Sequence, residues 1–339
     1  MRFSALALFA ALACAPAASL HAHEQPQAAA PRLVALQQRD ATLFATGWRL
    51  ATGNAAYCDG ASPAPGILVH DANAYGDREA VRAQLGLSGD IGVQAVAPGS
   101  PAAHAGVTAN MTLVSLDGVA LDAAFPRAEP RWQRLVDLHA AMAKAFENGS
   151  ATLGFAGTPQ STGPSPVVEV TLEGQRACPS RFEVLDEGKK AVADGARVIL
   201  GRDFPGFDFP PDQFAAAVAH ELAHNLLRHR VLLDREGRSR KLRRLTERDA
   251  DRLMPWLLYN AGFDPHAAAR FMENWGRNHG RSVFTRALYN EGWDERLEHI
   301  EAEITHLETV LAQTGEADWS RHFRREAEGE VRPLPAGER

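Results

Sequence analysis

The 339-residue sequence has few cysteines, no long apolar run after residue 22 and no excess of positive charge. No segment after residue 22 approaches the ~20 apolar residues that a membrane-spanning helix needs, so we expect no transmembrane segment in the mature chain. Thirty-six Lys and Arg against 42 Asp and Glu leave a net charge of −6, which gives no general signal for nucleic-acid binding. Apolar residues make up 45% and charged residues 23%, which indicates a globular protein with room for two ordinary domains.

The first residues have the pattern of a secretory signal peptide, Met1–Ala22. Arg2 supplies the positive start, Phe3–Leu12 the apolar region, and small residues follow. Cleavage is expected after Ala22 or Ala18, and the mature protein is expected to be periplasmic or secreted. A lipoprotein attached through Cys14 and an uncleaved membrane anchor are the less favoured alternatives.

Removal of the leader leaves two cysteines, Cys58 and Cys178. A pair of cysteines in an oxidising compartment predicts one disulfide. It would tie the N-terminal segment to a region 120 residues further along the chain. The alternative is two buried free thiols. Neither cysteine has neighbours in the sequence that suggest an activating base, so neither is expected to be a nucleophile.

The run Ala215–Arg230 contains a His-Glu-x-x-His motif, formed by His220, Glu221 and His224. It is rich in Ala and Leu and follows a Pro-Pro pair, which predicts a buried helix. Residues four apart share a helix face, so the two imidazoles can bind one metal ion while Glu221 reaches a water on it. The alternative is a pair of histidines that simply pack in the core.

A further metal ligand is expected downstream, because a catalytic zinc has three protein ligands and one open position. Glu247 and Asp251 are four apart and share a helix face. Glu247 is the candidate ligand, and Asp251 would accept the N–H of a ligand histidine. Alternatively, both are surface carboxylates paired with nearby arginines. The Arg-rich segment between the two motifs, Asp234–Arg248, indicates a solvated connector more than a basic binding patch.

Together, His220-Glu221-x-x-His224 and Glu247-x-x-Ala250-Asp251 resemble peptidase family 48 of the metallopeptidases, a gluzincin group. Asn225, Arg228-His229 and the run 261–265 add to the likeness, which covers about residues 181–311. The resemblance implies one Zn²⁺ bound by His220, His224 and Glu247, with Glu221 as general base. It also implies a mainly helical domain with a small sheet.

The chain departs from that family in two places. Pro255 falls inside the expected second helix, which should kink or restart there. The His-Pro pair common before the last helix is absent, which leaves Tyr289, Arg296 and His299 as candidates for an electrophilic helper.

The segment Ile91–Leu121 carries Val96-x-Pro98-Gly99-Ser100-Pro101-Ala102, Ala105-Gly106-Val107 and Asp117-Gly118. This segment predicts strands at 91–96 and 113–116 and a helical turn at 102–105, and the residues after it predict an amphipathic helix at 131–146 and closing strands at 151–155 and 167–172. On these residues, about 87–172 resemble a bacterial PDZ domain. The resemblance implies a peptide groove between residues 89–96 and the helix 131–146, whose apolar face would be Trp132, Leu135, Leu138 and Met142. A PDZ-shaped spacer without a ligand is the alternative.

Less distinctive segments complete the expected organisation. Gln25–Pro31 predicts a flexible linker and Arg32–Thr52 a packed helix. Short strands are expected at 181–185 and 197–200, the second being either an edge strand that holds substrate or an interior strand. The expected divisions are a leader (1–22), a linker and helical segment (23–85), a PDZ-like domain (86–175), a zinc peptidase domain (176–314) and a frayed charged tail (315–339).

The sequence therefore predicts an α+β protein: a mainly helical gluzincin-type peptidase domain with an inserted PDZ-like domain. Its expected activity is zinc-dependent cleavage of polypeptides, such as misfolded or exported proteins, in the cell envelope. Two alternatives are a PDZ-type peptide-binding protein or chaperone with a vestigial metal site, and a zinc hydrolase acting on a non-peptide bond.

Overall fold

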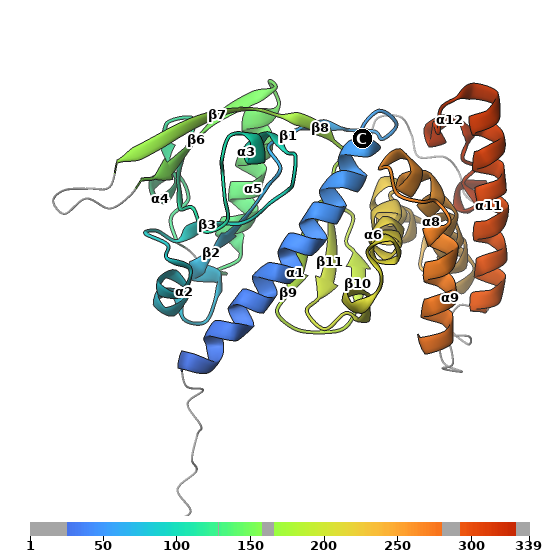
Figure 1. The fold of residues 1–339 in the computed structure, drawn as a ribbon, viewed down its shortest axis with the longest axis horizontal. Coiled ribbons are helices and arrows are strands. Elements are labelled where there is room, and N and C mark those ends of the chain that lie inside the picture. Colours follow the sequence, from blue (N-terminus) through green and yellow to red (C-terminus); the bar gives the residue numbers. More distant parts are fainter. Residues whose placement is uncertain (1–25, 128, 158–165, 280–291, 330–339) are drawn as a thin grey trace, which may run out of the picture.

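The computed structural model describes residues 26–127, 129–157, 166–279 and 292–329, and within them the chain is α+β, as predicted. The expected leader, residues 1–22, lies outside the described residues. A long helix, α1 (Pro26–Gly53), runs between a strand-rich unit and a helix-rich unit (Figure 1). In the described part of the chain, no helix has both the length and the apolar character needed to cross a bilayer.

Helix α1 packs on both units. It begins at Pro26, so the linker predicted up to residue 31 is wrong over 26–31: Ala and Gln favour a helix, and Pro is tolerated at the first position. Asp40 is buried in this helix. Its carboxylate accepts hydrogen bonds from the side chain of Gln94 in the strand-rich unit and from the backbone N–H of Val184 in the helix-rich unit, both at 2.7 Å. One carboxylate thus joins three parts of the fold.

The strand-rich unit occupies about residues 62–177. Its strands are β1 (Ser62–Ala64), β2 (Ile67–Asp71), β3 (Ile91–Val96), β4 (Leu113–Leu116), β5 (Val119–Ala120), β6 (Ser150–Ala156), β7 (Val167–Glu173) and β8 (Gln175–Ala177). Its helices are η1 (Ala72–Ala74), α2 (Arg78–Leu85), α3 (Pro101–His104), α4 (Leu121–Ala124) and α5 (Gln133–Phe146). Strands pair in the orders β2-β3, β1-β8 and β5-β4-β6-β7, all antiparallel. The strands and helices predicted between residues 91 and 172 are present, with ends shifted by at most two residues.

The core of this unit starts earlier than the predicted boundary at residue 86. Ile67 and Val69 of β2 pack in the same core as Leu138 and Phe146 of α5. Trp132, expected on the apolar face of the helix 131–146, is on the surface: its side chain is 59% exposed, because it precedes the first turn of α5. Arg134 is buried there instead, with its guanidinium 3.3 Å from the buried carboxylate of Asp90.

Strand β3 is not the open edge that the peptide groove was predicted to use. It pairs with β2 along one side, and on the other side Val93 donates its N–H to the carbonyl of Met111 while Gly92 bridges Thr112. Among the described strands, β2 pairs with β3 alone. Of these two strands, β2 rather than β3 therefore has an edge without a partner strand among the described residues.

The helix-rich unit contains a small sheet and packed helices. Its strands are β9 (Arg181–Leu185), β10 (Ala191–Ala193) and β11 (Arg197–Gly201). Its helices are η2 (Pro205–Asp208), α6 (Pro211–Leu226), α7 (His229–Glu236), α8 (Arg240–Asn260), α9 (Ala267–His279), α11 (Trp293–Thr314), α12 (Trp319–His322) and α13 (Glu326–Gly329). The strand order is β10-β11-β9, so β11 is an interior strand. Of the two alternatives for residues 197–200, an edge strand that holds substrate and an interior strand, the second is therefore correct. The edge strand beside α6 is β10.

Two expectations for the helices need correction. Of the two alternatives at Pro255, a kink or a restart, the restart is wrong, because helix α8 continues through Pro255, which is buried. The predicted frayed tail is ordered as far as residue 329, because Trp319, Phe323 and Ala327 bury their side chains against the helices.

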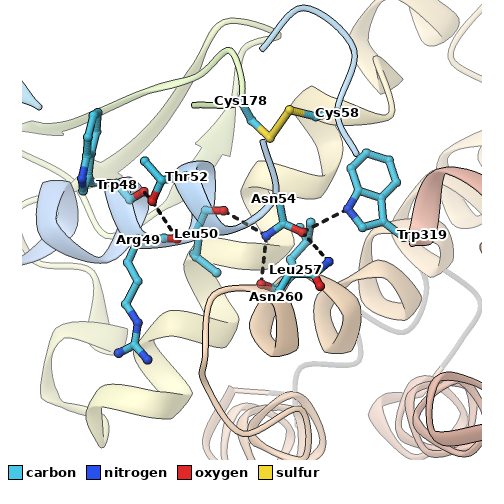
Figure 2. The surroundings of a disulfide bond; sticks show 10 residues. All are labelled: Trp48, Arg49, Leu50, Thr52, Asn54, Cys58, Cys178, Leu257, Asn260 and Trp319. Atoms are coloured by element: carbon cyan, nitrogen blue, oxygen red, sulfur yellow. Dashed lines mark hydrogen bonds between the residues drawn. A yellow bond between two sulfur atoms is a disulfide. The ribbon is translucent and has the colours of Figure 1, made fainter. Parts of the chain in front are cut away.

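The predicted disulfide between Cys58 and Cys178 is present. It joins the turn after α1 to the residues just before β9 (Figure 2). Asn54 is fully buried beside it and ties α1 to α8 and α12. The partners of its side chain are the carbonyls of Leu50 and Leu257, the amide of Asn260 and the indole N–H of Trp319, at 2.9–3.0 Å.

Candidate metal centre

The two motif histidines lie on one face of α6, as predicted from their spacing. Pro211 occupies the first turn, and the run 214–219 is buried in the core, which fixes the helix. The Nε2 atoms of His220 and His224 are 3.3 Å apart. Both rings therefore present a nitrogen to the same point.

The third candidate ligand comes from α8, which packs directly on α6. The carboxylate of Glu247 lies 3.5 Å from Nε2 of His220 and 3.6 Å from Nε2 of His224. The side chains of His220, His224 and Glu247 are 12%, 15% and 29% exposed, so solvent can reach the group. Within the described residues, these three form the group that could hold a metal ion.

The spacing of these atoms fits a single tetrahedral ion. Ligands at ~2.0–2.1 Å from such an ion lie about 3.3–3.4 Å from one another. The two Nε2 atoms are 3.3 Å apart, and the two oxygens of Glu247 lie 3.5 Å from Nε2 of His220 and 3.6 Å from Nε2 of His224, one oxygen to each. Two imidazole nitrogens and one carboxylate suit a transition metal better than Ca²⁺ or Mg²⁺, which take oxygen ligands. Three protein ligands are also the number found in catalytic zinc sites.

Asp251, one turn after Glu247, lies where the sequence predicts it. One of its oxygens is 3.0 Å from Nδ1 of His220, on the side of the ring away from Glu247. The carboxylate is fully buried and also accepts two hydrogen bonds from Arg296, at 2.6 and 2.7 Å. Asp251 thus lies against Nδ1 of one motif histidine and is itself held by an arginine.

The three candidates for an electrophilic helper have different positions. Arg296, on α11, is engaged with Asp251, and its Nη2 atom is 3.7 Å from Glu247. His299 lies about one turn further along α11 and is partly buried; no contact with the metal group is found for it among the described residues. Tyr289 lies outside the described residues. Arg296 is therefore positioned to steady the two carboxylates.

Glu221 is next to the metal group but contributes no ligand atom to it. Its carboxylate accepts a hydrogen bond from the backbone N–H of Ala193 at the end of the edge strand β10. Asn225 holds the turn after this strand: its side chain accepts the N–H of Gly195 and donates to the hydroxyl of Ser180. The sequence motif that supplies the ligands therefore also fixes the edge strand beside them.

Burial and charge set the protonation of these groups in the metal-free chain. Burial raises the pKa of Glu221 to about 7, and the Glu247 carboxylate adds to the rise. Burial lowers the pKa of His224 to about 4. Burial opposes the charged forms of His220 and Glu247 as well, but neighbouring charges outweigh it. The carboxylates of Asp251 and Glu247 raise the pKa of His220, and the contacts with His220 and His224 hold the pKa of Glu247 well below its usual range. The negative charges around His220 therefore favour a cation beside Glu247.

Two buried polar residues near the site were not predicted. His229 lies with its Nδ1 atom 2.9 Å from Nδ1 of His224, and Asp249 accepts the N–H groups of Glu326 and Ala327 at the start of α13. The sequence contains His229 only as part of the Arg228-His229 pair that resembles the family, which predicts no role for it. Its side-chain contact depends on the backbone turn at Arg228, which no periodicity reveals.

The arrangement combines a three-ligand metal group with a carboxylic acid whose pKa is about 7, beside an open strand edge. Such a combination can activate water against a bound carbonyl. Searches of protein-family models, curated proteins and solved structures find nothing that matches this chain.

Proposed function

We propose that the chain is a zinc-dependent endopeptidase similar to peptidase family 48, acting on polypeptides in the cell envelope. The observation that carries the proposal is the convergence of His220, His224 and Glu247, within 4.8 Å of one another, from two helices. Their donor types and separations support zinc as the metal. The predicted signal peptide and the disulfide support a periplasmic or secreted location.

Each residue of the site has a role in this proposal. His220, His224 and Glu247 hold the ion, which supplies Lewis-acid activation of water and of the scissile carbonyl at neutral pH. Glu221 takes the proton of the attacking water and later delivers it to the leaving amine. Burial raises the pKa of Glu221, which favours a group that must both accept and donate a proton.

The edge strand β10 supports an extended polypeptide as substrate. It pairs with β11 on one side alone, and its last residue, Ala193, donates to Glu221. A peptide added along the open edge makes backbone hydrogen bonds irrespective of its sequence. The exposed side chain of Val192 on this strand suits an apolar neighbour in the substrate.

A peptide groove in the strand-rich unit is part of the proposal, at β2 and α5. A pocket of about 660 Å³ lies there, lined by Ile67 and Leu68 of β2 and by His139, Ala140 and Ala143 of α5. It extends to Phe182 and Gly195 in the helix-rich unit. In a PDZ-like unit this position would capture an extended peptide before cleavage.

Cleavage of an unfolded protein with and without a chelator tests the proposal. Casein incubated with the zinc-loaded protein should be cut, the chelator should stop cutting, and added Zn²⁺ should restore it. Cleavage that persists after the metal has been removed would rule out the proposed role of the site.

The pocket also supports a second function, a peptide-binding protein or chaperone, because the metal ligands do not line it. Under that function the metal-free protein would bind denatured casein as tightly as the loaded protein, and neither form would cleave it. A zinc hydrolase acting on a non-peptide bond is less well supported, since both the pocket and the strand edge suit polypeptides.

A further inference from the structure

The chain turns sharply between α6 and α7, directly after the motif helix. Arg228 has a left-handed backbone conformation, with φ 55° and ψ 35°, and His229 is the first residue of α7. This conformation is uncommon for a residue with a side chain. The turn places the ring of His229 against the ring of His224, with their centroids 4.9 Å apart.

The two nitrogens of His224 face different partners. Nε2 faces His220 and Glu247, at 3.3 and 3.6 Å. Nδ1 faces Nδ1 of His229 at 2.9 Å, which is hydrogen-bonding distance for two nitrogens only if one of them carries a proton. His229 is 3% exposed, so water does not compete for this contact.

We propose that His229 is a positioning residue that accepts the Nδ1–H of His224 and so keeps the Nε2 lone pair of His224 directed at the metal. The proton on Nδ1 of His224 then fixes its tautomer, and His229 carries its own proton on Nε2. His229 does not bind the metal itself, because it contacts the side of His224 that faces away from Glu247. This role rests on the proposed metal site.

The two ligand histidines are then supported in different ways. His220 is held by the carboxylate of Asp251, and His224 by a buried imidazole. Partners of this kind contribute to metal affinity, and removing one costs about 10–100-fold. The neutral imidazole supplies orientation at His224 without adding a third carboxylate to a site that already holds Glu247 and Asp251.

The test compares two substitutions at position 229 by their affinity for Zn²⁺, measured by competition with a chromophoric chelator. His229→Leu removes the acceptor and should weaken Zn²⁺ binding 10–100-fold. His229→Asn places a carbonyl oxygen near the position of Nδ1 and should restore affinity to within a few-fold of wild type. The control is His70→Leu, which removes a buried imidazole that contacts Tyr75 in the other unit and should leave affinity unchanged.

The measured Zn²⁺ affinities decide whether His229 has the proposed role. Equal affinity in wild type and His229→Leu overturns the role, as does equal weakening of the folded Leu and Asn variants. If the Leu variant does not fold, nitrogen NMR of the zinc-loaded wild type still decides: His224 must carry its proton on Nδ1, and a metal-shifted His229 would overturn the role. A wild-type protein that binds no Zn²⁺ would instead refute the proposed function.

Discussion

Replacing Glu221 by Gln should separate metal binding from catalysis. Glutamine has the same size and can still accept the N–H of Ala193 through its carbonyl oxygen, but it cannot take a proton from water. Since Glu221 contributes no ligand atom, the variant should hold one zinc ion as tightly as the wild type.

The expected loss follows from the role of a general base. Such a group contributes about 10²–10⁴-fold to rate, which corresponds to about 3–5 kcal/mol at ~1.4 kcal/mol per tenfold. We therefore expect kcat/KM to fall by at least about a hundredfold.

The assay is the cleavage rate of a fluorogenic peptide or of casein by zinc-loaded proteins, with zinc content measured on the same samples. Glu298→Gln, at an exposed position on α11, is the matched control and should retain full activity. An active Glu221→Gln variant would remove Glu221 from the mechanism. A variant that lost its zinc would show that Glu221 belongs to the metal site instead.

Three further predictions concern affinity and stability. Asp251→Asn should weaken Zn²⁺ binding about 10–100-fold in chelator competition, because it removes the carboxylate 3.0 Å from Nδ1 of His220; unchanged affinity would contradict this role. Burial raises the pKa of Asp40 to about 7, so its stabilising contribution is complete below about pH 4 and is lost as pH rises through 7. In urea unfolding, Asp40→Asn should remove up to about 4 kcal/mol of the change in unfolding free energy with pH. Wild-type and variant curves of unfolding free energy against pH that run parallel would contradict this. Replacing Cys58 and Cys178 by Ser should lower the free energy of unfolding by up to about 5 kcal/mol, since the bond joins residues 120 apart; equal urea midpoints would contradict this.

Much of the fold could be predicted because its signals are local. The alternation at 91–96 and the helical spacing at 131–146 gave elements within two residues of those observed. His220 and His224 could be paired from their spacing alone, since a helix fixes where residues four apart point. Glu247 required a second motif, because nothing local states that α8 packs on α6.

The features that the sequence did not predict depend on contacts between distant residues or on the backbone conformation of a single residue. Strand β10 has three residues, too few for a periodic pattern, and its pairing with β11 was not predicted. Trp132 was expected on the apolar face of its helix, yet it is exposed and Arg134 is buried. Arg134 is buried because its guanidinium pairs with Asp90, which is distant in the sequence. The contact of His229 with His224 follows from one left-handed residue, Arg228.

The most direct test of the account is the zinc content of the purified protein after equilibration with excess Zn²⁺ and dialysis, measured by plasma mass spectrometry. The wild type should retain one zinc per chain, and a folded variant with His220 and Glu247 both changed to Ala should retain none. A wild type without zinc, or a double variant that retains as much, would contradict the claim that side chains from α6 and α8 bind one ion together.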